Sequence, residues 1–235
     1  MPLPFAPVRR LTGLLLTAAA LSLAACGGDG DETATPLEET EATQTAEAPA
    51  EEGGCRDVEQ PPAKPEGELS APKRELDPGK RHEVVVTTSC GEFTIRLDPE
   101  SAPKAAASFA SLAEKGFFDD TYFHRIVPGF VIQGGDPTGT GTGGPGYSTE
   151  DTPAPGTRYT KGVVAMAKGG PEPAGTAGSQ FFVVTGEDTG LPAEYAAIGE
   201  VTDGIEVVEA IGALGDAAEQ PLQVITIEGT KVSSR

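Results

Sequence analysis

The sequence is poor in the residues that most catalytic and metal sites use. It has no tryptophan, two histidines and three cysteines in 235 residues, with no cysteine-rich spacing, so it predicts no metal site. Basic residues are also few, since 17 Lys and Arg stand against 36 Asp and Glu and give a formal net charge of −19. Such a field repels nucleic acid, and we expect no nucleic-acid partner.

The mostly apolar run Leu11–Ala25 is too short to span a bilayer comfortably, but it follows Arg9 and Arg10 and is typical of an export signal. It leads into LAAC, whose cysteine is Cys26, and this stretch resembles the lipobox of bacterial lipoproteins. The resemblance implies cleavage before Cys26 and a lipid on its sulfur. The expected location is extracytoplasmic, lipid-anchored to the bacterial cell membrane. An ordinary secretory signal is the alternative, and the arginine pair leaves Sec or twin-arginine export open.

The composition changes after Cys26. Residues 27–52 hold nine acids and no basic or aromatic residue, so they cannot bury enough apolar area to offset the entropy of ordering. Prolines between residues 61 and 72 continue the irregular stretch. We expect three parts: a signal peptide at 1–25, an acidic, proline-containing disordered tether at 26–80 that begins with the lipidated Cys26, and a folded domain at 81–235.

Two cysteines remain once Cys26 is assigned to the lipid. Cys55 and Cys90 form an even pair in a chain expected to be exported, which favours a disulfide between the tether and the domain. Two independent reduced thiols are the alternative.

The domain reads as many short strands with two helices. EVVVTTSCGEFTIRLD predicts a hairpin at 83–98, and APKAAASFASLAEKG predicts a helix that Gly116 ends. Further strands are expected at 123–127, 130–133, 162–166, 181–185, 196–201 and 224–228, with a second helix at 205–211. Strands separated by Gly and Pro, without a βαβ rhythm, favour an antiparallel barrel over a sandwich.

Several familiar chemistries find no support in the residues. Gly139, Gly141 and Gly144 fit G-x-G-x-x-G, but no helix pattern follows them, so a dinucleotide site is not expected. No serine elbow or cysteine near histidine favours acyl transfer. His124 and Arg125 are adjacent in an expected strand, so they should face opposite sides, and His124 is interpreted as a scaffold residue.

A reaction without nucleophile or proton carrier fits better. Rotation about an X-Pro bond is one, and it needs only an environment that binds the twisted bond better than either planar form. The stretches FHRIVPGFVIQGGD, GTGTGG, GVVAMAKGG and GSQFFV, in that order, resemble the cyclophilin-type peptidyl-prolyl cis-trans isomerases over nearly all of residues 81–231. The resemblance implies a mainly β fold, a closed eight-stranded antiparallel barrel capped by two α-helices, and no cofactor.

The resemblance also implies a site. Arg125 would be the catalytic residue, Phe130, Val131 and Phe182 would line the proline pocket, and Gln133 and Gln180 would orient the substrate or Arg125. Backbone groups of Ala167 and Lys168 would contact the residues before proline, although many relatives have Asn at the Lys168 position. Leu191 and Tyr195 would close the pocket, since Gly190 stands where many relatives carry Trp.

The leading hypothesis is a monomer that isomerises X-Pro bonds of unfolded or exported, proline-containing polypeptides outside the cytoplasm and assists their folding. A low-turnover proline-peptide binding module or chaperone on the cell envelope is the alternative. A purely structural envelope lipoprotein would explain the tether and nothing in the domain.

Overall fold

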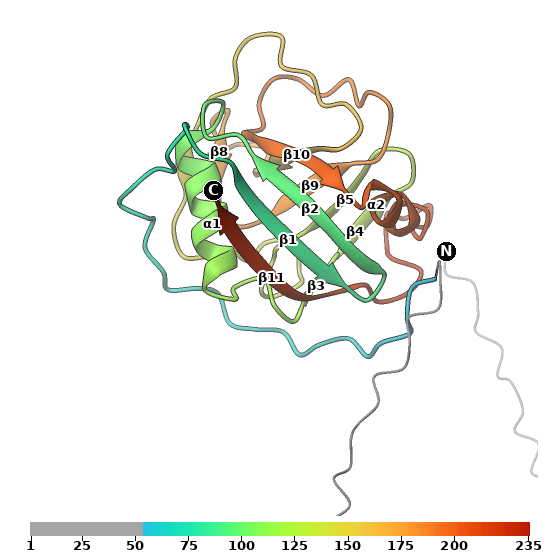
Figure 1. Ribbon diagram of the computed structural model, residues 1–235. Helices are drawn as coiled ribbons and strands as arrows, with labels where there is room; N and C mark the ends of the chain where they lie inside the picture. The colour runs from blue at the N-terminus through green and yellow to red at the C-terminus, as the bar shows by residue number, and fades with distance from the viewer. Residues whose placement is uncertain (1–53) are drawn as a thin grey trace, which may run out of the picture. The chain divides into compact units, whose positions relative to one another are not determined.

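The computed structural model describes residues 54–235, which form one folded unit (Figure 1). The expected signal peptide, Cys26 and the tether up to residue 53 lie outside the described residues. Within the described part, no helix has both the length and the apolar character needed to cross a membrane.

A hairpin forms where alternating apolar residues flank a short turn. β1 (His82–Thr88) pairs antiparallel with β2 (Gly91–Leu97), and this pairing places Val84 opposite Ile95. Both side chains are fully buried, as the alternation in the sequence predicts. β11 (Thr226–Ser234) pairs with the other side of β1, and Figure 1 shows the three strands side by side. The predicted hairpin is confirmed.

The remaining strands are mostly short. They are β3 (Thr121–Tyr122), β4 (Arg125–Val127), β5 (Val131–Gly134), β6 (Thr149–Glu150), β7 (Val163–Met166), β8 (Thr176–Ala177), β9 (Phe181–Val184) and β10 (Ala197–Asp203).

Nine strands form one curled antiparallel sheet in the order β3-β11-β1-β2-β10-β7-β9-β5-β4, and β6 pairs with β8 separately. Among residues 54–235, each edge strand has a single partner, β11 for β3 and β5 for β4, and no ladder joins the two edges. The mainly β class with two helices is confirmed, but the closed eight-stranded barrel is wrong. Pairing is interrupted at Phe123 and His124, between the two edge strands, and this leaves an open half-barrel.

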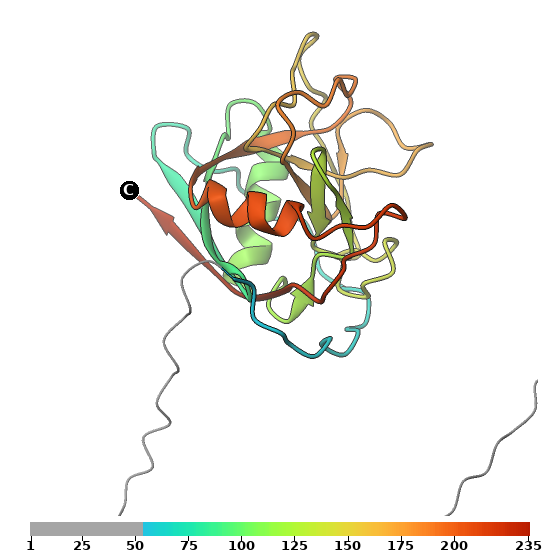
Figure 2. The same cartoon turned by 90° about the vertical axis from the view of Figure 1, so that its right-hand side faces the viewer.

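Two helices cover the sheet. α1 (Pro103–Glu114) begins with proline, whose missing N–H costs nothing in a first helical turn, and buries Phe109 and Leu112. Gly116, at φ 64°, adopts a left-handed conformation just beyond its end. α2 (Ile205–Gly212) packs against β2, β5 and β4, whereas α1 packs against β11 and β10. The helices lie at opposite ends of the curled sheet (Figure 1), and in the view turned by 90° α2 lies in front of α1 (Figure 2). Buried residues of both helices belong to the same main core.

Strand alternation divides the buried apolar residues into two clusters. In β9, Phe181 and Val183 belong to the main core inside the sheet, whereas Phe182 and Val184 belong to a smaller cluster on the opposite face. β5 and β7 divide their residues in the same way. The smaller cluster turns out to be part of the candidate site.

Residues 54–80, here called the N-terminal segment, contain no helix or strand but run along the domain (Figure 1). The amides of Lys64, Gly67 and Leu69 donate hydrogen bonds of 2.9 Å to the carbonyls of Pro137, Gly144 and Pro145. The folded unit therefore begins before Arg81, the boundary expected from the sequence.

A disulfide joins Cys55 to Cys90, so the predicted pairing is confirmed. The amide of Arg56 donates to the carbonyl of Ser89 at 2.8 Å beside it. The covalent link closes a loop over 35 positions and holds the start of the N-terminal segment at the β1–β2 turn.

Replacing Cys55 and Cys90 together by Ser should lower the free energy of unfolding by about 2 to 4 kcal/mol, because the unfolded chain regains the freedom of the open loop. Urea unfolding of the full chain measures this, and the wild type under reducing conditions should match the double variant. Equal unfolding midpoints for oxidised wild type and variant would contradict the expectation.

Candidate functional site

Antiparallel register gathers side chains from four strands into one row. Arg125 of β4 lies opposite Gln133 of β5, which lies opposite Phe182 of β9, which in turn lies opposite Ala165 of β7. Directly paired residues point to the same face of a sheet. Ile126 belongs to the main core, so its neighbour Arg125 lies on the other face. Three residues that were predicted from two separate motifs are thus brought together.

An apolar cluster lies on the same face. Val131 and Phe182 are 2% and 4% exposed, and they pack with the buried Tyr159, Ala165 and Val184. Partly buried side chains surround them, and these include four more of the predicted substrate-binding residues: Phe130, Ala167, Leu191 and Tyr195. A buried floor with a partly open apolar rim suits a small apolar ring.

Tyr159 forms the floor and positions the rim. Its hydroxyl donates to the backbone carbonyl of Tyr195 at 2.7 Å and accepts from the Tyr195 amide at 3.0 Å. The Tyr195 ring stands edge-on to Phe182, with 5.5 Å between the ring centroids. Burial raises the pKa of Tyr159, so its hydroxyl stays protonated and can keep donating. Tyr195 is thereby fixed against the pocket rather than free to swing.

A chain of polar contacts leads away from Arg125. Its NH1 donates to the side-chain oxygen of Gln133 at 3.2 Å, and the Gln133 amide donates to the side-chain oxygen of Gln180 at 3.1 Å. The Gln180 amide in turn donates to the carbonyl of Gly143 at 3.0 Å. Each amide has one orientation that satisfies both neighbours, so the guanidinium meets a fixed acceptor.

The hydrogen-bond chain from Arg125 ends at Gly143, in a glycine-rich loop that Asp136 organises. Its carboxylate, in a residue 1% exposed, accepts from the amides of Thr138, Gly141 and Gly143 at 2.7, 2.6 and 3.1 Å. Burial by itself would raise the pKa of Asp136, but the hydrogen bonds from the hydroxyl and amide of Thr138 and from the amides of Gly143 and Gly141 hold it below its ordinary value. The loop is therefore organised around a negative charge that persists at neutral pH.

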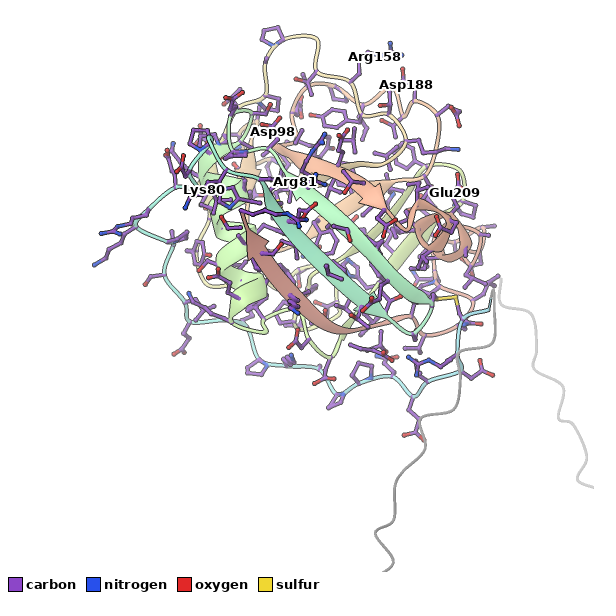
Figure 3. All side chains as sticks on the ribbon, viewed as in Figure 1. Lys80, Arg81, Asp98, Arg158, Asp188 and Glu209 are labelled. Carbon is purple, nitrogen blue, oxygen red and sulfur yellow. A yellow bond between two sulfur atoms is a disulfide. The ribbon has the colours of Figure 1, made fainter. Side chains whose placement is uncertain are left out.

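The segment that carries Leu191 is also tied down. The Thr189 amide donates to the Tyr159 carbonyl at 3.1 Å, and Arg158 forms an ion pair with Asp188. Figure 3 shows these two labelled side chains next to each other at the loop side of the domain. Through these contacts Leu191 is held at the rim of the pocket.

Lys168 occupies an unusual environment for a lysine. Its side chain is 4% exposed, and its ammonium group lies 3.2 Å from a carboxylate oxygen of Glu194 and 5.7 Å from the centre of the Tyr195 ring. The ammonium thus links the loop after β7 to the pocket rim. The amide of Ala167 donates to the Gln180 carbonyl at 2.9 Å. The expected contact of Ala167 and Lys168 backbone groups with substrate stays a prediction.

His124 differs from expectation in one respect. It lies between β3 and β4, outside any strand, so strand alternation does not separate it from Arg125. Both residues line a cavity of about 300 Å³, and the expectation that they would not share a pocket is wrong. Burial lowers the pKa of His124, and the nearby Asp136 offsets this only in part.

A larger cavity, of about 570 Å³, lies on the Gln180 side of the row. Its walls come from the glycine-rich loop, the loop after β7 and the N-terminal segment, and they include Gln133, Gly143, Lys168, Gln180 and Glu66. The N-terminal segment therefore contributes to the surroundings of the site, which sequence analysis did not foresee.

Three residues that shape the site were missed from the sequence. Tyr159, Asp136 and Glu219 act through partners that lie far away in the chain or through backbone amides. Glu219 accepts a hydrogen bond from Nε of Arg125 at 2.7 Å across 94 positions. Among 36 acids, nothing local distinguishes Glu219 from a solvated surface residue.

Comparison with known proteins identifies the fold and the family that the chain resembles. Residues 83–232 match the family described as "Cyclophilin type peptidyl-prolyl cis-trans isomerase/CLD". A "Peptidyl-prolyl cis-trans isomerase-like 1" of Aspergillus fumigatus is 40% identical over 155 residues, which are 64% of this chain and 94% of that protein. A peptidyl-prolyl cis-trans isomerase of Arabidopsis thaliana is 36% identical over 159 residues, covering 66% and 95%.

Among solved structures, a cyclophilin-type isomerase of Cryptosporidium parvum, crystallised in the presence of the dipeptide Ala-Pro, superposes with a TM-score of 0.60. It is 34% identical in sequence, and the match covers 65% of this chain and 99% of that one. The family match begins at Glu83, after the N-terminal segment.

Asp136→Asn should make stability less dependent on pH in the acid range. The pKa of Asp136 is lowered in the folded state, so its stabilisation is present at neutral pH and is lost as pH falls below about 4, through the lowered value. Urea unfolding from neutral pH to about pH 2 measures the slope. Asp57→Asn, an exposed change in the N-terminal segment, is the control and should follow the wild type. Parallel curves for wild type and Asp136→Asn would refute the assignment.

Proposed function

Since the chain belongs to the cyclophilin-type peptidyl-prolyl cis-trans isomerases and is an enzyme of that activity, we propose that Arg125 is its catalytic group and that its substrates are exported polypeptides. One observation carries the catalytic part of the proposal. The guanidinium of Arg125 is held by Gln133 and Glu219 in the same row as Phe182, a buried member of the apolar cluster.

Bond rotation explains why an arginine belongs there. Resonance across a peptide bond produces a barrier of about 18–20 kcal/mol, and twisting the bond returns a lone pair to the proline nitrogen. A guanidinium N–H aimed at this lone pair stabilises the twisted state more than either planar state. No proton is transferred, so the site needs neither an acid nor a base.

The apolar cluster is proposed to bind the proline ring. Val131 and Phe182 would form its buried wall, and Phe130, Leu191 and Tyr195 its rim. Gln133 and Gln180 would orient Arg125 and the substrate backbone, as their hydrogen-bond chain supports. Ala167 and Lys168 would meet the residues that precede proline. With the ring fixed in the pocket, the bond before it is the part of the substrate that turns.

Arg125→Ala should slow isomerisation of an X-Pro peptide at least about 100-fold, because the developing lone pair loses its donor. Arg125→Lys should recover only part of the rate, since an ammonium group lacks the planar fork of donors. The measurement is cis-to-trans exchange by NMR without a coupling protease.

Arg96→Ala is the matched control for this experiment. Arg96 is paired with the exposed Glu200 on β2 and β10, outside the row, so its loss should leave the rate unchanged. A wild-type rate in Arg125→Ala would overturn the catalytic assignment. Binding of the peptide without acceleration by the wild type would indicate a binding module instead.

The location is proposed from the N-terminal sequence. Arg9, Arg10, the apolar run and LAAC before residue 27 support export and a lipid on Cys26, which would anchor the enzyme outside the cytoplasm of a bacterium. The family match begins at Glu83, so it does not bear on this part of the proposal. The Cys55–Cys90 disulfide fits an oxidising compartment. Nascent exported chains with X-Pro bonds would then be the clients.

Cys26→Ser should move the protein from the membrane fraction to the soluble fraction, because each buried acyl methylene contributes about 0.8 kcal/mol to anchoring. Fractionation of bacterial cells followed by intact mass measurement tests this. Cys55→Ser is the control and should stay with the membrane. A wild-type protein that lacks the lipid mass would sink the anchoring proposal.

A further inference from the structure

The loop between α2 and β11 places one carboxylate against the proposed catalytic arginine. Glu219 lies in this loop with its backbone at φ 65°, a left-handed conformation that residues other than glycine rarely adopt. Strained backbone of this kind persists only where the surroundings impose it, and it is frequent at functional sites. The conformation of Glu219 therefore needs a cause.

The surroundings of Glu219 supply that cause. Asp216 accepts hydrogen bonds from the amides of Ala218 and Gln220 at 2.8 Å each, and its own amide donates to the Gln220 carbonyl at 2.9 Å. The Glu219 carbonyl accepts from the amide of Ile126, the residue after Arg125, at 3.1 Å. The loop is thus closed on itself and fastened to β4 beside the arginine.

The side chain of Glu219 is the second of two acceptors that hold the Arg125 guanidinium. Glu219 accepts from Nε of Arg125 at 2.7 Å, and Gln133 accepts from NH1 at 3.2 Å. Because a guanidinium is planar, two acceptors on different edges fix both its position and its plane. NH2 has no acceptor among residues 54–235 and remains available to a substrate.

We propose that Glu219 is a positioning residue that holds the Arg125 guanidinium in the orientation that isomerisation requires. This inference rests on the catalytic role proposed for Arg125. The cavity of about 300 Å³ beside the pair, bounded by Arg125, Gln133 and Glu219, gives the guanidinium room to rotate once the carboxylate is gone. A reacting group that is misplaced by a small distance loses much of its effect.

A stabilising surface ion pair does not account for these observations. The side chains of Arg125 and Glu219 are 33% and 49% exposed, and pairs in such settings add little to stability. A left-handed glutamate works against stability. The left-handed backbone of Glu219 lowers the stability of the fold, whereas its carboxylate fixes the orientation of the Arg125 guanidinium.

Glu219→Gly and Glu219→Gln separate positioning from folding. Glycine removes the carboxylate and also relieves the left-handed backbone, so the melting temperature should not fall. Its kcat should be about fivefold to tenfold lower, with KM nearly unchanged. Glutamine keeps an acceptor oxygen and should stay within about threefold of wild type. NMR exchange on the full chain with an Ala-Pro peptide gives both constants.

A spectroscopic signature and a matched control complete the design. The Nε–H resonance of Arg125, assigned by its absence in Arg125→Ala, should move in Glu219→Gly and move less in Glu219→Gln. Glu200→Gly removes the carboxylate from a comparably exposed pair with Arg96, away from the site, and should change neither kcat nor the resonance.

The outcomes distinguish this inference from the proposed function. If Arg125→Ala is slow and Glu219→Gly is also slow, with the shifted resonance and rescue by Gln, Glu219 positions the arginine. If Arg125→Ala is slow but Glu219→Gly keeps the wild-type kcat, or is slow only because it melts earlier, the inference is overturned. If Arg125→Ala itself is as fast as wild type, the catalytic role of Arg125 fails first.

Discussion

The register of β4, β5, β9 and β7 is the constraint on which the site depends. Arg125, Gln133 and Phe182 share a face only because each is paired directly with the next across the sheet. Side chains alternate along a strand, so a slip of one residue would turn Phe182 into the core and Phe181 out of it. The main core therefore selects the register, and the same selection assembles the row of site residues.

Contacts with loops orient side chains of the site that the sheet alone does not orient. The row fixes backbone positions, but the orientation of Gln180 depends on Gly143 and so on the buried charge of Asp136. The N-terminal segment adds hydrogen bonds to the same glycine-rich loop and is itself held by the disulfide. Structure outside the matched family region thus reaches the surroundings of the site through one continuous set of contacts.

The sequence was informative where a local pattern carried the physics. Alternation revealed the β1–β2 hairpin, and proline and glycine bounded α1. Two motifs supplied Arg125, Gln133 and Phe182, which the structure places in one row. Two-residue strands such as β3, in contrast, have no periodicity to detect. A closed barrel was predicted wrongly because strand pairing breaks at Phe123 and His124. These residues lie in the motif FHRIV, and no glycine or proline there signals an interruption. Glu219 was missed because only tertiary structure brings it to Arg125.

Three titratable groups around the row, His124, Tyr159 and Asp136, have pKa values shifted in the direction that preserves their protonation states at neutral pH. Burial lowers the pKa of His124 and raises that of Tyr159, which keeps both uncharged, while hydrogen bonds from Thr138, Gly143 and Gly141 outweigh burial and keep Asp136 charged. Sites that move protons hold groups with pKa values near the working pH. Here the fixed protonation states keep the hydrogen bonds of the site in place. This suits a reaction whose only requirement is that a donor be in position when the peptide bond twists.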